Sequence, residues 1–259
     1  MRRWMRVLRP ILLAAFVLAI IEGITRTFDV PKWLFPSPTA VFSAFWETLP
    51  LLAGHTLATL WAALIGMAAS TLAGMILGIT VFTSRFLRST LYPLLVASQS
   101  LPTIVVAPLL VLWFGFGMLP KVLLVVLACF FPICVGVVDG LSSADPELID
   151  LAKSMGAKSW RLFWKVRWPA SLPSIFTGIR VSATYAIIAT VVSEWMGSQK
   201  GLGVYLTRSS HSFLTDRVFA VLFVIAGLSM AIFSGVNFLA RKAAPWYYRV
   251  ETDIWEVEK

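Results

Sequence analysis

Charged residues are scarce in this sequence. They make up 14% of its 259 residues, whereas a soluble domain usually carries about 25%. Hydrophobic residues make up 58%, and a water-soluble fold of that composition would expose more apolar surface than water tolerates. The shortage of charge therefore predicts a chain that lies largely in lipid.

Cysteine and histidine are also rare, with two residues of each. Cys129 and Cys134 lie within one apolar run, at a spacing that differs from C-x-x-C. We interpret them as small packing residues of a helix. His55 and His211 are expected in loops outside the membrane, where nothing pairs them into a set. We therefore predict no metal site.

Sequence motifs of common catalytic sites are absent. The chain has no G-x-x-x-x-G-K-[ST] phosphate loop, since Gly197, Gly201 and Gly203 are not followed by Lys-Ser or Lys-Thr. It also lacks H-E-x-x-H and G-x-S-x-G. We therefore predict no catalytic residues, no ATP hydrolysis by this chain alone and no cofactor bound by it.

Long apolar stretches are what the sequence does contain. Crossing a membrane takes about 20 residues, and six stretches reach or approach that length. They are Leu8–Ile24, Leu57–Val81, Leu91–Phe114, Val122–Val138, Ser174–Val192 and Val218–Leu239. Within the second, small residues recur at intervals of four, which predicts close packing against a neighbouring helix. These residues are Gly66, Ser70, Gly74 and Gly78.

The net charge of +9 comes from basic residues that lie between the apolar runs and form no single patch, which argues against a nucleic-acid partner. Lys and Arg favour cytoplasmic loops, where they also attract anionic lipid. With the N-terminus inside, most of them fall on the cytoplasmic side, so both termini are expected there. Because no A-x-A-like cleavage site follows residues 1–24, we interpret this stretch as an uncleaved first span.

The third stretch contains Pro93, Pro102 and Pro108, so we expect it to be kinked or broken. Polar residues inside spans usually face a cavity or another helix. Those around Pro102 are candidates for lining a pathway, and helix packing is the alternative. They are Ser98, Gln99, Ser100 and Thr103.

The fifth stretch adds Tyr185 and, near its outer end, Glu194 as further pathway candidates. Glu194 could gate the pathway, bind a basic group of the solute, or pair with Arg180 or Arg208. Arg180 itself is expected to extend toward the cytoplasmic interface.

Two segments between the stretches are not expected to cross the membrane. Thr25–Thr56 is an outside connection in which a stiff turn at Phe35–Thr39 precedes a helix, with a serine or threonine as N-cap. Asp139–Pro173 is a cytoplasmic loop of about 35 residues, and loops of that length usually carry a function.

The first part of the cytoplasmic loop has the signals of a short helix. Asp145 suits the N-cap and Pro146 the first helical position. Gly156 suits the position after the helix, where positive φ is required. Negative residues favour the N-terminal end of the helix dipole, and here they are Glu147 and Asp150. One apolar face follows from Leu148, Leu151, Ala152 and Met155.

A second short helix is predicted over Ser159–Val166, ended by Trp168 and Pro169. Trp160, Phe163 and Trp164 share one side of it. We expect the two helices to lie across the membrane surface, and a simple interfacial role on lipid is the alternative to docking a partner.

The spacing in this loop resembles the EAA loop of permease subunits of bacterial ATP-binding-cassette (ABC) importers. That motif runs E-A-A, three residues, G, nine residues, I-x-L-P. This chain has Asp150-Leu151-Ala152, Gly156, and then Val166-Arg167-Trp168-Pro169 at the same spacing. Leu151 departs most from the motif, because it is bulkier than the usual alanine.

Other short sequences are similar to the nitrate, sulfonate and taurine branch of these permeases. They are Phe35–Pro38, Ser100–Pro102, Ala107–Leu109 and Gly201–Gly203. Within that branch, Ser212-Phe213 followed by Thr215–Ala220 resembles permeases for thiamine-precursor pyrimidines.

The resemblance implies an all-α polytopic membrane protein of the type I importer kind, with six transmembrane helices and one permease domain over residues 1–259. It implies a bacterial inner-membrane location and a cargo that is a small organic solute. Implied partners are a cytoplasmic ATPase dimer that binds ATP and Mg²⁺, an extracytoplasmic binding protein and a second permease copy, either identical or similar. In such permeases the loop is a coupling helix that docks into the ATPase. Its implied coupling residues are Glu147, Asp150, Leu151, Ala152, Met155, Gly156, Trp160 and Pro169.

Two other classes remain as alternatives. An integral membrane enzyme requires acidic or histidine residues gathered at one depth, whereas Glu22, Asp139 and Glu194 are scattered over both faces. An ion-coupled transporter should show inverted repeats with broken helices in both halves, whereas only the third stretch here is broken by prolines.

Overall fold

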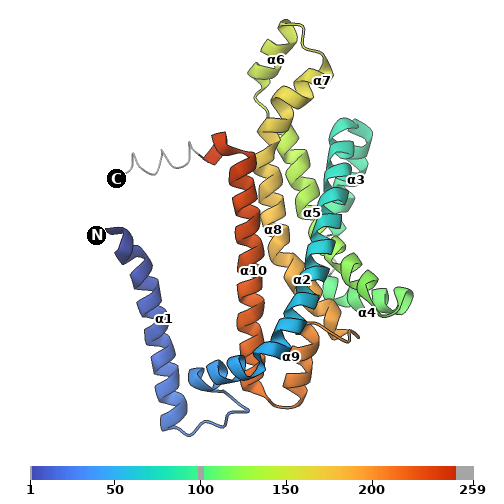
Figure 1. Cartoon of the computed structure of the whole chain (residues 1–259). Coiled ribbons are helices and arrows are strands. Elements are labelled where there is room, and N and C mark those ends of the chain that lie inside the picture. The colour runs from blue at the N-terminus through green and yellow to red at the C-terminus, as the bar shows by residue number, and fades with distance from the viewer. Residues whose placement is uncertain (1, 99–101, 249–259) are drawn as a thin grey trace.

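A computed structural model describes residues 2–98 and 102–248, and all regular structure in these ranges is helical (Figure 1). For residues 2–7, 10 and 98 it describes the backbone. The helices in chain order are α1 (Arg2–Thr27), α2 (Pro38–Thr83), α3 (Arg85–Ser98), α4 (Thr103–Phe114), α5 (Met118–Ser142), α6 (Pro146–Ser154), α7 (Ser159–Leu162), the π-helical turn η1 (Phe163–Arg167), α8 (Trp168–Trp195), α9 (Leu202–His211) and α10 (Thr215–Ala243).

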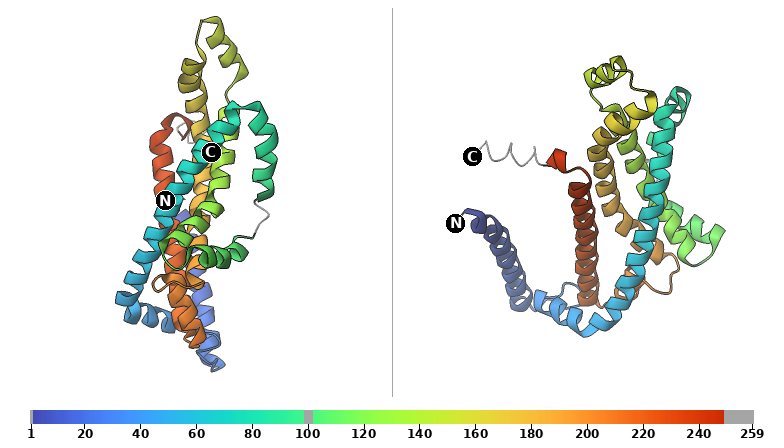
Figure 2. Two further views of the ribbon diagram at one scale, coloured as in Figure 1. Left: turned by 90° about the vertical axis from the view of Figure 1, so that its right-hand side faces the viewer. Right: turned by 45° about the horizontal axis from the view of Figure 1, so that its top comes forward.

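The core of the molecule is a bundle in which α5 packs against α2 on one side and α8 on the other, while α10 packs on α8 and α2. The α6–α7 hairpin projects from one end of this bundle, here called the loop end, and α9 lies at the opposite end, the α9 end (Figures 1 and 2).

Small residues let α2 and α5 approach closely, as predicted. A Cβ added at Gly66 would come within 2.5 Å of Val125 Cβ, and one at Gly78 within 2.6 Å of Val137 Cβ. Cys129 is fully buried between α5 and α8, where the Ser182 hydroxyl donates to its carbonyl at 2.7 Å. The interpretation of Cys129 as a packing residue is therefore confirmed.

Four helical segments of the described chain are long and apolar enough to cross a membrane: α2, α5, α10 and the continuous segment Ser159–Trp195. The predicted break in the third stretch is confirmed, because α3 and α4 are separate helices and α4 is shorter than a span. The first predicted stretch lies within α1.

The second stretch begins much earlier than predicted. The turn at Phe35–Thr39 leads into α2 at Pro38, with the Ser37 hydroxyl accepting from the Ala40 N–H at 3.3 Å, and α2 then continues for 46 residues. The prediction that His55 and His211 lie in loops is wrong, because His55 is buried within α2 and His211 is the last residue of α9. Figure 2 shows α2 bending along its length, and Pro50 provides the reason, since proline disrupts helix hydrogen bonds.

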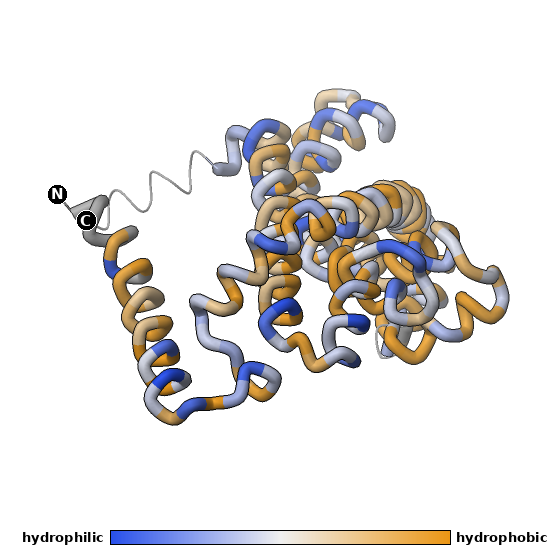
Figure 3. The backbone as a smooth tube through the Cα atoms, turned by 60° about the horizontal axis from the view of Figure 1, so that its bottom comes forward, coloured by the Kyte–Doolittle hydropathy of each residue, from blue (hydrophilic) through white to orange (hydrophobic). Residues whose placement is uncertain are grey.

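Helix α1 stands apart from the bundle (Figures 1 and 2). It is tied to the start of α2 by the Glu22 carboxylate, which accepts from Arg26 Nε at 2.6 Å, the Thr39 hydroxyl at 2.7 Å and the Thr39 N–H at 3.0 Å. Its apolar side chains, from Leu8 to Ile24, are largely exposed, and Figure 3 shows their hydrophobic character along the helix. A polar clasp rather than apolar packing therefore sets the position of α1.

Candidate functional site

The α6 helix begins and ends as the sequence predicts. The Glu147 N–H donates to Asp145 Oδ1 at 2.8 Å, and Pro146 occupies the first helical position. At the other end Gly156 has φ +79°. The Gly156 N–H donates to the Lys153 carbonyl at 2.9 Å, and the Ala157 N–H donates to the Ala152 carbonyl at 2.9 Å. These two bonds form a Schellman motif, which requires positive φ at Gly156.

The predicted apolar face of α6 is mostly exposed, and the residue that anchors the helix, Ile149, was not part of that prediction. Ile149 is buried with Ala144 and Leu162, and Ala152 packs at the edge of this small cluster, so that α6 is held against α7. The other large apolar residues point outward, and with Trp160 of α7 they form what we call the docking tip. Their exposures are 54% for Leu148, 59% for Leu151, 79% for Met155 and 71% for Trp160. An exposed apolar group of this kind, rimmed by the exposed Glu147 and Asp150, is typical of a surface that another protein or a membrane covers.

The prediction that Pro169 ends the second loop helix is wrong. Helix α7, the turn η1 and α8 form one continuous helical segment of 37 residues. Proline lacks an N–H and its ring clashes with the carbonyl four residues earlier, which is that of Lys165. Here Lys165 lies in the wider π-helical turn, which relieves the clash and lets the helix continue. The second half of the loop is thus an extension of a span rather than a helix lying across the membrane surface.

Aromatic rings run from the docking tip to the bundle. The ring centroids of Trp160 and Trp164 are 5.5 Å apart, and those of Trp164 and Trp168 are 5.6 Å apart. Trp168 and Phe163 pack on the buried residues Val137, Leu141 and Ile175 of α5 and α8. The exposed tip and the helix core are therefore joined by a chain of ring contacts.

The predicted pathway residues fall into different places. Gln99, Ser100 and the side chain of Ser98 lie outside the described residues. Pro102 is the exposed N-cap position of α4, and Thr103 is half-buried beside it. Tyr185 lies on an exposed face of α8. The other exposed residues of that face are Thr177, Val181, Thr184 and Ile188.

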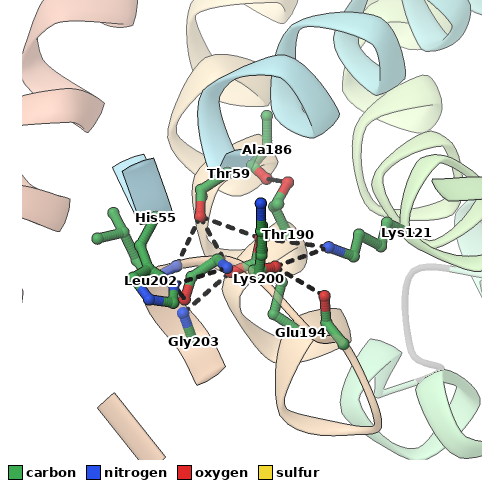
Figure 4. A network of polar contacts seen from close by, with 11 residues as sticks. His55, Thr59, Lys121, Ala186, Thr190, Glu194, Lys200, Leu202 and Gly203 are labelled. Atoms are coloured by element: carbon green, nitrogen blue, oxygen red, sulfur yellow. Dashed lines mark hydrogen bonds and ion pairs between the residues drawn. The ribbon is translucent and has the colours of Figure 1, made fainter. Parts of the chain in front are cut away.

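Glu194 is 1% exposed and faces a buried polar network at the α9 end, not an open path (Figure 4). The Thr59 hydroxyl lies 3.0 Å from both carboxylate oxygens, the Gly203 N–H donates to Oε2 at 2.9 Å, and Lys121 Nζ is 3.6 Å from Oε1. The prediction that Glu194 pairs with Arg180 or Arg208 is wrong, because the cation beside its carboxylate is Lys121. Arg180 instead donates to the Thr177 hydroxyl at 2.9 Å.

The same network fixes the segment Gly201–Gly203. His55 Nδ1 lies 3.0 Å from the Gly201 N–H and 2.9 Å from its carbonyl oxygen, and its tautomer decides which bond forms. The Leu202 N–H donates to the Thr59 hydroxyl at 2.8 Å. A side chain at Gly201, where φ is +139°, would collide with the Glu194 carboxylate. These contacts join α2, α5, α8 and α9 at one point.

Comparison with known proteins indicates a transport permease. Residues 70–245 match the family described as "Binding-protein-dependent transport system inner membrane component". The chain is 35% identical to a probable ABC transporter permease protein of Haemophilus influenzae, over 92% of this chain and 97% of that protein. It is 36% identical to the formylaminopyrimidine transport permease protein ThiX of Halalkalibacterium halodurans, over 95% of this chain and 98% of that protein.

Further relatives are named as transport permeases for riboflavin (Chloroflexus aurantiacus), aliphatic sulfonates (Bacillus subtilis) and taurine (Escherichia coli). Among solved structures, an inward-facing MetNI methionine ABC transporter superposes with a TM-score of 0.62 and 17% identity, covering 75% of this chain and 98% of that one. The fold is that of a type I ABC importer permease.

Proposed function

Because this chain belongs to the family of binding-protein-dependent transport system inner membrane components, we propose that the α6–α7 loop of this importer permease docks onto a separate cytoplasmic ATPase. The chain is an integral inner-membrane transport subunit and not an enzyme, as its relatives are permease proteins. Coupling is the part of its function for which the loop geometry is most informative.

The observation that carries the proposal is the docking tip. Leu148, Leu151 and Met155 project from a helix whose opposite face is anchored by the buried Ile149. A helix held this way presents apolar knobs at helical spacing, which is the arrangement used when a helix inserts into a groove of a partner. The rim carboxylates of Glu147 and Asp150 would set its orientation, and ATP and Mg²⁺ would be bound by the partner.

The remaining partners follow from the same assignment. One bundle with a single loop supplies half of a symmetric pathway, so we propose a homodimer that engages two ATPase subunits at the loop end. The α9 end then faces outward, where a substrate-binding protein delivers the solute, and both termini lie in the cytoplasm.

The exposed face of α8 is our candidate for the pathway lining. Tyr185 and Thr184 give this face polar groups within a span, where such groups usually face a cavity or a partner helix. The segment from Ser98 to Thr103, at the break between α3 and α4, is proposed to contribute the other side. Glu194 is buried in the polar network, so we assign it a structural role and not a place in the pathway lining.

For the cargo we propose a thiamine-precursor pyrimidine of the formylaminopyrimidine kind. The similarity to ThiX over nearly the full length of both chains supports it, as does the resemblance at Ser212–Ala220. Relatives named for sulfonates, taurine and riboflavin make those solutes the competitors in a test.

The test of coupling is Gly156→Val. Valine at φ +79° is strongly disfavoured, so the end of α6 should distort, and ATPase co-purification and solute uptake should both be lost. Gly227→Val is the matched control, because nothing lies within 4 Å of a Cβ built there. The proposal would be contradicted if the permease never co-purified with an ATPase and the Gly156→Val variant still took up solute normally.

The test of cargo uses the complex reconstituted in vesicles with its binding protein. We expect formylaminopyrimidine to stimulate ATP hydrolysis more than taurine, an alkyl sulfonate or riboflavin at equal concentration. Stimulation by a sulfonate alone would replace the pyrimidine assignment and leave the coupling proposal standing.

A further inference from the structure

Arg167 is the last residue of η1, where the loop rejoins the bundle. In the spacing of the EAA-like motif it occupies the unspecified position between Val166 and Trp168, so the motif assigns it no role. Its side chain is half-buried, which is costly for a charged group unless nearby groups stabilise it.

Two contacts stabilise the Arg167 guanidinium. Its central carbon lies 5.0 Å from the centroid of the Phe82 ring, within the range of a cation–π interaction. Its Nη1 donates to the Leu141 carbonyl at 3.3 Å. Phe82 is in the last turn of α2, and Leu141 is in the last turn of α5.

These contacts join the end of the loop to α2 and α5. The backbone connects the loop to α5, which it leaves, and to α8, into which it continues, but not to α2. Apolar packing of Phe82 around Leu141 and Trp168 brings α2 nearby, and Arg167 adds a directional contact to the α2 ring face. The far part of α2 carries His55 and Thr59, which hold Gly201–Leu202 at the α9 end.

We propose that Arg167 is a positioning residue that fastens the coupling loop to α2 and α5, so that displacement of the docking tip moves α2 together with α8. The inference rests on the proposed coupling function. It adds a second route from the ATPase to the α9 end, through α2, beside the continuous helix Ser159–Trp195.

The experiment measures whether loop and α2 move as one body. Spin labels are placed at Lys158→Cys in the loop and Thr83→Cys at the end of α2, both exposed positions, in the assembled complex with and without ATP. With Arg167 present, we expect the distribution of distances between the two labels of one protomer, separated from distances between protomers by mixing labelled with unlabelled copies, to be narrow and the same in both nucleotide states.

In Arg167→Met the distribution should broaden or differ between the two states. ATP hydrolysis per solute transported should rise about two- to fivefold, the change expected for losing one partly exposed cation–π contact. Arg167→Lys, which keeps a cation over the ring, should restore most of the narrow distribution. Phe82→Leu removes the ring face but keeps an apolar side chain, and it should behave as Arg167→Met does. It replaces Arg167→Met in the test if Arg167→Met folds poorly.

Lys165→Met is the matched control, since Lys165 lies in the same turn and is exposed; it should change neither measurement. An unchanged distance distribution in both Arg167→Met and Phe82→Leu would overturn the inference. That outcome is separate from failure of the proposed function, which would show as absence of the ATPase from the purified complex.

Discussion

The Glu194 carboxylate shows how much a single buried group depends on residues without side chains. It accepts the Gly203 N–H and approaches the backbone of Gly201, and a side chain at either glycine would meet Glu194 or the backbone of α8. Thr59 and Lys121 complete its surroundings from α2 and α5. The glycines are therefore needed for close approach as well as for backbone conformation.

Gly201→Ala should destabilise the assembled protein. The added Cβ would collide with Glu194, and φ +139° is strained for alanine, so we expect a loss of about 1–3 kcal/mol. Denaturation in detergent, followed by tryptophan fluorescence, measures it. Gly227→Ala is the control and should cause no loss, because a Cβ there meets open space.

Lys121→Met should be more damaging than the double variant Lys121→Met/Glu194→Gln. The single change leaves a buried carboxylate without its cation, which typically costs about 3 kcal/mol or more. Glutamine in place of Glu194 removes that charge while still accepting the Gly203 N–H. A double-mutant cycle on unfolding free energy checks this, and strictly additive losses would show that the two side chains do not interact.

At the scale of elements, the α6–α7 hairpin combines an anchored face with an exposed one. Ile149 and Leu162 hold the two helices together, while Leu151 and Met155 remain uncovered. Stability and partner binding should therefore depend on different residues of the same hairpin.

Leu151→Asn should weaken ATPase binding and leave the unfolding free energy within about 0.5 kcal/mol of the original. Loss of one apolar anchor at a docking surface is typically worth about 1–2 kcal/mol, or about tenfold in affinity. Titration of the purified permease with its ATPase measures the affinity. Ile149→Asn should instead lower the unfolding free energy, because it buries an amide in the α6–α7 cluster. Equal losses of unfolding free energy in both variants would contradict the separation of an anchoring face from a binding face.

Local signals in the sequence were sufficient to predict α6, because its caps depend on Asp145, Pro146 and Gly156 themselves. The same reasoning failed at Pro169, where the rule that proline ends a helix does not foresee a π-helical turn. The polar network could not be predicted, since Thr59, Lys121 and Glu194 are far apart in sequence and meet through tertiary packing alone. Two signals pointed to parts of it: the Gly-Leu-Gly segment, through a family resemblance, and Glu194, for which pairing with a cation was one expectation, although the cation is Lys121.

At the scale of the whole molecule, the bundle and α1 are built differently. Helices α2, α5, α8 and α10 share a buried core, whereas α1 is attached through Glu22, Arg26 and Thr39 and lies outside residues 70–245 that match the family. The orientation of the chain in the membrane determines whether the loop end can meet the proposed ATPase and the α9 end the proposed substrate-binding protein.

Cysteine labelling should report that orientation. Lys32→Cys, on the α1–α2 connection, should react with a membrane-impermeant maleimide in spheroplasts, and Lys158→Cys, in the α6–α7 loop, should react after permeabilisation. Both lysines are exposed, while the native Cys129 and Cys134 are fully buried and should give little background. Labelling of Lys158→Cys in intact spheroplasts would mean that the loop faces outward and cannot meet an ATPase.

The long helix α8 has a mechanical consequence. Its 28 residues give it a length of about 42 Å, so pivoting it by about 5° would displace one end relative to the other by about 4 Å. One end of α8 continues from α7 and η1, which carry the aromatic residues of the loop, and Glu194 is the next-to-last residue at the other end. A small rotation imposed at the loop end would thus reach the α9 end as leverage.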